Sequence, residues 1–101
     1  MHVIVDLCVI PIGQGVSVSK EVSEVEKIIR KSGLTHKLHG YGTNIEGPWD
    51  EVFSLVKRCH QQLHDSGVAR VSSSMRIGTR TDKQQSIQDK IDKVEDLITD
   101  T

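Results

Sequence analysis

The spacing of apolar residues changes repeatedly along the chain, and these changes constrain the fold more than any other feature. β-Branched residues in short runs or in strict alternation indicate strands, whereas apolar residues that recur every three or four positions indicate amphipathic helices. The strand pattern occupies residues 3–10, 34–39, 43–46 and 68–77, and the helical pattern occupies residues 18–29, 48–63 and 87–98. The predicted order is therefore strand, helix, strand, strand, helix, strand, helix.

The first six elements match the split βαβ order of a ferredoxin-like βαββαβ sandwich, so we predict an α+β fold of this kind with an extra C-terminal helix. Such a fold lays two crossover helices on one face of an antiparallel sheet and leaves the opposite face to be covered by another element. The chain of 101 residues suffices for one core, and we expect a single domain over residues 1–101. The last helix carries an apolar stripe that needs a partner surface: Ile87, Ile91, Val94 and Ile98.

Residues at the ends of the elements predict local geometry. Ser17 or Ser19 can cap the first helix, and Pro48 suits the first position of the second helix. Between the two middle strands, Gly40 and Gly42 flank a tyrosine, which predicts a hairpin turn with a glycine at positive φ.

Composition and charge narrow the class of function. Thirteen Lys and Arg residues against fourteen Asp and Glu give a formal net charge of -1, so no overall field attracts nucleic acid or an acidic membrane. Aromatic residues make up 3% of the chain, too few to stack bases, and we expect neither a nucleic acid nor a membrane partner. Cys8 in an apolar strand and Cys59 in a helical stripe favour reduced thiols and a cytoplasmic location.

Side chains alternate between the two faces of a strand, so the sequence also predicts what the uncovered sheet face carries. If the valines of the first strand face the helices, the open face receives Ile4, Asp6, Cys8 and Ile10. By the same rule it receives Asn44 and Glu46 from the third strand and, from the last, Arg70, Ser72, Ser74 and Arg76. This face is too charged for a purely apolar contact and too apolar for full exposure to water.

Two compatible interpretations of the open face follow. One is an oligomer contact in which an acid of this face pairs with an arginine, Asp6 or Glu46 with Arg70 or Arg76. The other is a small-ligand site at or beside such a contact.

We predict neither catalytic residues nor a metal. The loop at residues 11–16 lacks the arginine that an acyl-phosphate hydrolase of this fold needs for its anion. His60 and His64 have the spacing of a chelating pair on a helix, but the pattern places no acidic third ligand beside them. A structural or regulatory oligomeric module without a small-molecule ligand is the alternative function, followed by a small hydrolase on the same fold.

Several segments resemble the small thiamine-binding protein family, formerly known only as an uncharacterised family. The most specific is the block at residues 41–52, Tyr-Gly-Thr-Asn-Ile-Glu-Gly-Pro-Trp-Asp-Glu-Val. The segments at residues 11–13, 17–19, 67–71 and 76–80 resemble its remaining blocks in the same order. The resemblance implies a ferredoxin-like subunit that forms homodimers or homotetramers and binds thiamine or its hydroxymethylpyrimidine moiety, with no cofactor and no established catalysis.

A thiamine-type ligand requires an anion, hydrogen-bonding groups and a flat neighbour, because it joins a cationic thiazolium to an aminopyrimidine. We expect Glu46 to meet the charge or the exocyclic amine, with Asp6 second, and Arg70 to orient Glu46 or to contact a phosphate on an esterified ligand. Tyr41 or Trp49 can stack on a ring, although Trp49 at a helix start also fits an ordinary packing anchor. Short hydrogen bonds are expected from Ser17, Ser19, Thr43 and Asn44.

Overall fold

The computed structural model describes residues 1–16 and 18–99, so the predictions for Ser17 fall outside the described residues. The elements follow in the predicted order: β1 (His2–Ile12), α1 (Ser19–Lys31), β2 (Thr35–His39), β3 (Gly42–Pro48), α2 (Trp49–Asp65), β4 (Arg70–Gly78) and α3 (Ile87–Thr99). The strands form one sheet in the order β2-β3-β1-β4, and every neighbouring pair is antiparallel. This is the ferredoxin-like arrangement, and the predicted fold is confirmed.

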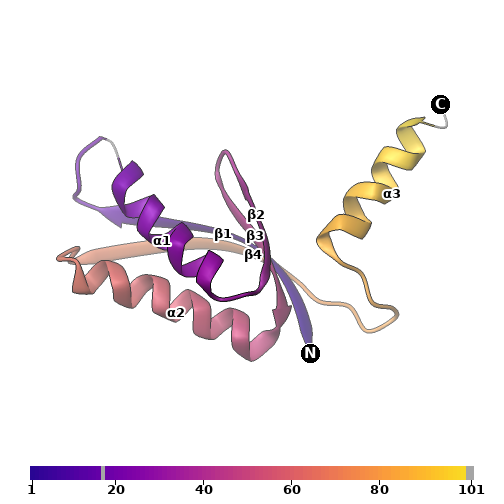
Figure 1. Cartoon of the computed structure of the whole chain (residues 1–101), viewed down its shortest axis with the longest axis horizontal. Helices are drawn as coiled ribbons and strands as arrows, with labels where there is room; N and C mark the ends of the chain where they lie inside the picture. The colour runs from indigo at the N-terminus through magenta and orange to yellow at the C-terminus, as the bar shows by residue number, and fades with distance from the viewer. Residues whose placement is uncertain (17, 100–101) are drawn as a thin grey trace.

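Helices α1 and α2 lie side by side on one face of the sheet, whereas α3 stands apart beyond the end of β4 (Figure 1). The core fills the space between the sheet and these two helices, and its fully buried members include Val3, Val5, Ile29, Ile45, Val52, Leu55, Cys59 and Leu63. The odd-numbered residues of β1 from 3 to 9 are all buried, so the alternation predicted for this strand is confirmed.

The opposite face of the sheet carries the side chains expected there. Residues that lie opposite each other on neighbouring antiparallel strands point to the same side of the sheet. Asp6 lies between Asn44 on β3 and Arg76 on β4, and Ile4 lies between Glu46 and residue 78. These side chains therefore share the face that α1 and α2 leave open.

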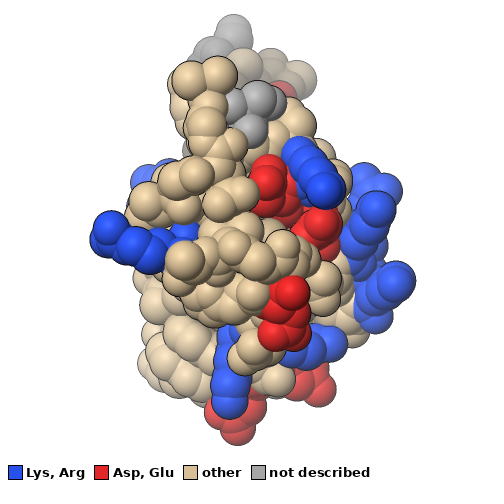
Figure 2. Space-filling model, turned by 90° about the vertical axis from the view of Figure 1, so that its left-hand side faces the viewer, with Lys and Arg blue, Asp and Glu red and all other residues tan. Residues whose placement is uncertain are grey.

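The surface mixes charges of both signs. Seen from the end of the molecule away from α3, Lys and Arg side chains are interspersed with Asp and Glu (Figure 2), in keeping with the formal net charge of -1. Among the described residues, no helix combines the length and the apolar character that crossing a bilayer requires.

The starts of two helices differ from the prediction. Val18 precedes α1 without a capping side chain, and its carbonyl oxygen accepts the N–H of Val22 at 2.9 Å. Ser19 is therefore the first helical residue and not the cap. Pro48 keeps extended backbone angles (φ -59°, ψ 138°) at the end of β3, so α2 begins one residue later, at Trp49.

Two strand boundaries also differ. β4 begins at Arg70 rather than at residue 68, because the N–H of Val68 bonds to the carbonyl oxygen of Leu63 at 3.0 Å and so completes the end of α2. β1 continues through Pro11 to residue 12. A proline is tolerated there because β3 pairs with β1 only as far as Leu7, which leaves one side of β1 without a strand partner.

The hairpin between β2 and β3 requires a glycine, but not for a positive φ angle. Neither Gly40 nor Gly42 is among the positive-φ glycines of the described residues, so that prediction is wrong. A Cβ atom on Gly42 would instead collide with the backbone carbonyl oxygen of Leu7. Gly42 is needed because β1 and β3 approach closely at this point.

Candidate functional site

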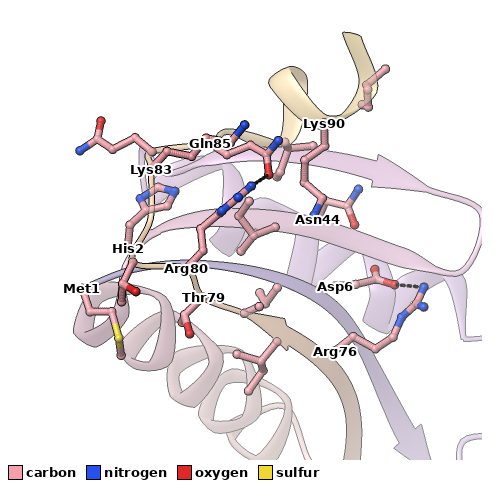
Figure 3. Close-up of a pocket in the computed structure, with 18 residues that line it drawn as sticks. Met1, His2, Asp6, Asn44, Arg76, Thr79, Arg80, Lys83, Gln85 and Lys90 are labelled. Atoms are coloured by element: carbon pink, nitrogen blue, oxygen red, sulfur yellow. Dashed lines mark hydrogen bonds and ion pairs between the residues drawn. The ribbon is translucent and has the colours of Figure 1, made fainter. Parts of the chain in front are cut away.

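A cleft of about 1050 Å³ lies between the open face of the sheet and the segment that leads from β4 into α3 (Figure 3). The strands contribute Ile4, Asp6, Asn44 and Arg76, and the segment and α3 contribute Arg80, Lys83, Gln85 and Lys90. The cleft therefore lies on the side of the sheet opposite α1 and α2, where a polar floor meets a strongly basic wall.

Asp6 is the centre of the hydrogen bonds on the floor of the cleft. His39 Nε2 lies 2.6 Å from Asp6 Oδ1, and Arg76 Nη2 lies 3.6 Å from Asp6 Oδ2. The N–H of Tyr41 donates to His39 Nδ1 at 3.2 Å, so the ring proton is on Nε2 and is donated to Asp6. About a third of the Asp6 side chain remains exposed, at 31%, and can meet a ligand.

Arg80 holds the segment between β4 and α3 in a compact turn. Its guanidinium donates to both carboxylate oxygens of Asp82, at 2.5 and 2.7 Å, and to Gln85 Oε1 at 2.7 Å. Hydrogen bonding to Arg80 lowers the pKa of Asp82 to about 2. Where α3 begins, the N–H of Ser86 donates to Asp89 Oδ2 and the N–H of Asp89 donates to Ser86 Oγ, which forms a capping box.

Glu46 fastens the first residue of α3 to the sheet. Its Oε2 accepts the N–H of Ile87 and a hydrogen bond from His2 Nε2, each at 3.2 Å, and only 7% of the residue is exposed. A carboxylate at this position also interacts favourably with the positive end of the helix dipole. Glu46, His2 and Gln85 line a second, smaller hollow of about 460 Å³ next to the main cleft.

Of the predicted ligand residues, the structure brings Asn44 and Glu46 together on the open face. Asn44 lies opposite Asp6 and lines the main cleft, whereas Glu46 lies opposite Ile4 and lines the smaller hollow. Of the predicted set within the described residues, these are the two residues that line a cavity beside the open face.

Thr43 and Trp49 belong to the other side of the sheet. Thr43 is 3% exposed, and its Oγ1 donates to Glu26 Oε2 on α1 at 2.6 Å. Trp49 packs against the core and stacks on Phe53, with ring centroids 4.5 Å apart. Neither side chain lines the cleft, and Trp49 has the packing role that was its alternative interpretation.

Tyr41, Ser19 and Arg70 lie away from the cleft. Tyr41 is 91% exposed at the tip of the hairpin, and Ser19 is exposed at the start of α1. Arg70 lies opposite Ile12 at the far end of β1, whereas Glu46 lies beside its beginning. At a rise of roughly 3.3 Å per residue, about 26 Å separate the two along the strand, so the predicted pairing of Arg70 with Glu46 is wrong.

Three residues that line the cleft, His2, Lys83 and Lys90, were not among the predicted ligand residues. The sequence did contain one signal for these residues. The connector after the last strand is rich in charged and amide side chains and leads to an apolar helix. Because α1 and α2 occupy one face of the sheet, this connector can only lie next to the other face.

The histidine beside Asp6 is already engaged, and Cys59, His60 and His64 lie on the other side of the sheet, in or on α2. Both ring nitrogens of His39 have partners, so His39 is not a free base in the cleft. Burial raises the pKa of the Cys59 thiol to about 11, and Cys59 lies in the core between sheet and helices. His60 and His64 each bond to an oxygen of β4 or of the turn before it, and no metal-binding cluster occurs among residues 1–16 and 18–99.

The sequence of the chain is similar to one protein family over most of its length. A family model described as thiamine-binding protein matches residues 5–95. The chain is 55% identical over 95 residues to UPF0045 protein sll0230 of Synechocystis, with 94% of this chain and 78% of the relative covered. It is 50% identical over 101 residues to UPF0045 protein ECM15 of Eremothecium gossypii, with 99% and 96% covered.

Solved structures share the fold. Hypothetical protein MJ1052 of Methanocaldococcus jannaschii superposes with a TM-score of 0.86 at 33% identity, over 93% of this chain and 96% of that one. A candidate thiamine biosynthesis/salvage protein of Thermotoga maritima, TM0486, gives a TM-score of 0.81 at 19% identity over 93% and 99%, which concerns the fold alone. Because the family model covers nearly the whole chain and relatives of high identity extend over the same residues, the chain belongs to the thiamine-binding protein family.

Proposed function

We propose that this protein binds thiamine or its hydroxymethylpyrimidine moiety in the cleft on the open sheet face, without catalysing a reaction, and does so as a homo-oligomer. One observation carries the proposal. In a member of the thiamine-binding family, a cleft of about 1050 Å³ has Asp6 and Asn44 directly opposite each other on its floor. Its volume is close to the upper end of the range of roughly 300 to 1000 Å³ typical of small-molecule sites.

The floor of the cleft offers the groups that an aminopyrimidine requires. The exocyclic amine of the ring donates hydrogen bonds and the ring nitrogens accept them. Asp6 supplies carboxylate oxygens that keep lone pairs beyond the contacts with His39 and Arg76, and Asn44 supplies an amide that both donates and accepts. Ile4, half-buried two residues before Asp6 on the same face of β1, gives the ring an apolar surface to lie on.

Binding without catalysis is supported by the state of His39, the histidine next to Asp6. Both of its ring nitrogens already have partners, so His39 is not a free base for a ligand in the cleft. The two cysteines are free thiols, which we take to favour a reducing compartment such as the cytoplasm.

Assembly of several copies is proposed from the exposed part of α3. Ile87 at its start is buried, but Val94 and Leu97 further along are 57% and 58% exposed. Large apolar side chains on one face of a helix are stabilised when another surface covers them. We propose a second copy of this chain as that surface, in a homodimer or homotetramer.

Isothermal titration calorimetry with thiamine and with hydroxymethylpyrimidine tests the binding proposal. We expect saturable binding, and we expect Asn44→Ala and Asp6→Asn to weaken it by about 1 to 3 kcal/mol each, the usual value of a hydrogen bond to a charged or buried partner. Ser72→Ala is the matched control, because Ser72 shares the open face but lies opposite Ile10, outside the cleft.

The outcomes separate the candidate functions. An absence of heat with either ligand at millimolar concentration would favour the module without a small-molecule ligand. Equal losses in Ser72→Ala and Asn44→Ala would place the ligand elsewhere on the sheet.

A further inference from the structure

The lining of the main cleft carries more positive than negative charge, although the chain as a whole is close to neutral. It contains one carboxylate, that of Asp6, and four cationic side chains, Arg76, Arg80, Lys83 and Lys90. In Figure 3, Lys90 reaches from α3 toward the sheet, above the region where Asn44 and Asp6 are drawn. The excess of cations is thus a local feature of this cleft.

Each of the two arginines has a carboxylate neighbour within the chain. Arg80 forms a two-pronged pair with Asp82, and Arg76 lies 3.6 Å from Asp6. The side chain of Arg76 is still 91% exposed, so its guanidinium can turn to a second anion.

The two lysines supply the unpaired charge. Within residues 1–16 and 18–99, neither Lys83 nor Lys90 forms an ion pair with a carboxylate at 4.0 Å or less. Lys83 acts on Asp82 and Asp89 only from a longer range, where it contributes to the lowered pKa of both carboxyl groups. Both ammonium groups can therefore bind an external anion at little cost in broken pairs.

Such a lining favours a ligand that also carries negative charge over one whose only charge is positive. Thiamine carries a permanent thiazolium cation, which the lysines repel and which one partly engaged carboxylate attracts. We propose that the basic wall of the cleft binds a phosphate group, so that a phosphate ester of thiamine or of hydroxymethylpyrimidine is preferred over the free compound. This inference rests on the proposed function.

The two sides of the cleft then have separate roles. Asp6 and Asn44 on the floor bind the aminopyrimidine, and Lys83 and Lys90 on the wall bind the phosphate oxygens. A lysine ammonium binds phosphate as a point charge, without the fixed geometry that an arginine imposes. One wall can for this reason accept a monophosphate or a diphosphate.

A comparison of the affinities of thiamine and thiamine diphosphate tests the inference. We expect thiamine diphosphate to bind at least about tenfold more tightly than thiamine at low salt, since one charge-assisted contact is worth roughly that factor. The preference should shrink between 0.05 and 0.5 M salt, because the screening length falls well below the roughly 10 Å of 0.1 M salt. Lys83→Gln and Lys90→Gln should each weaken thiamine diphosphate about tenfold and leave thiamine unchanged or slightly tighter.

A second lysine on α3 serves as the control for the loss of charge. Lys93→Gln removes the same charge from the same helix but from a residue outside the cleft lining, and it should leave the preference intact. An equal loss in Lys93→Gln and Lys90→Gln would assign the effect to overall charge and overturn the inference. Equal affinities of thiamine and thiamine diphosphate would also overturn it while leaving the proposed function standing.

Inorganic diphosphate tests whether the basic wall binds phosphate groups in the absence of the rest of the ligand. If it binds and depends on Lys83 and Lys90 while thiamine and hydroxymethylpyrimidine give no heat, the basic wall is supported and the proposed function fails. If none of these compounds binds, both ideas fail.

Discussion

Removal of the Glu46 carboxylate should loosen α3 without unfolding the sheet. Glu46 Oε2 accepts the N–H of Ile87 at 3.2 Å in a buried setting, and a hydrogen bond to a charged group is worth about 1.5 to 3 kcal/mol. The distance is at the long end for such a bond, which favours the lower half of that range. The helix dipole adds about 0.3 to 1 kcal/mol, whereas the bond from His2, whose side chain is 50% exposed, adds little.

The sum is about 2 kcal/mol for Glu46→Ala, which corresponds to roughly 30-fold faster amide exchange at Ile87. Hydrogen exchange followed by NMR measures this at single residues. Val5 in the core of the sheet is the internal reference and should keep its protection, because its neighbours do not change. Glu46→Gln retains an acceptor oxygen and should accelerate exchange at Ile87 by only a few-fold. Unaltered protection of Ile87 in Glu46→Ala would show that this contact does not hold α3.

Three further predictions concern other parts of the chain. Truncation before Ile87 removes the exposed apolar stripe of α3 and should change the number of subunits in the assembly, as measured by light scattering; an unchanged subunit number would contradict the proposed role of α3. Gly42→Ala should lower the free energy of unfolding by about 1 to 3 kcal/mol in urea titrations, because its Cβ meets the carbonyl oxygen of Leu7. Gly40→Ala meets nothing within 4 Å and should be nearly neutral, so similar losses in the two variants would refute the close approach of β1 and β3. Asp82 should titrate with a pKa of about 2 by NMR, and Arg80→Gln should return it toward 3.8. Since the folded-state pKa is the lower one, the contribution of this pair is present above about pH 4 and is lost as the pH falls toward 2; an ordinary pKa in the unmodified protein would argue against the pairing.

Periodicity was sufficient to predict the fold and the two faces of the sheet. The alternation in β1 predicted that Val3 and Val5 face the helices and that Asp6 does not, because a strand has only two sides and one of them must be apolar. The same rule also contained information that the site prediction did not use. Thr43 has the parity of Ile45, which is buried against the helices, so its place away from the open face follows from the sequence alone.

Contacts between residues on different strands could not be predicted from the sequence. Whether Glu46 meets Arg70 or Arg76 depends on the register of β1 with β4, and the alternation within one strand does not determine that register. The partner of Glu46 was unpredictable for a similar reason. The amide of Ile87 follows the connector after β4, in which Arg80 bonds to Asp82 and Gln85, and the spacing of apolar residues does not specify the path of such a connector.

Helix α3 has an unusual position in the molecule, since its first turn is fastened to Glu46 while its second half extends away from the sheet (Figure 1). Ile87, Lys90 and Ile91 nevertheless supply one wall of the cleft. The width of the cleft is thus set by a helix that is fixed at one end. A neighbouring subunit that binds the far end of α3 would therefore also change the width of the cleft in which a ligand binds. Linked equilibria act in both directions, so a ligand that prefers one width would strengthen the subunit contact by the same factor by which that contact strengthens ligand binding.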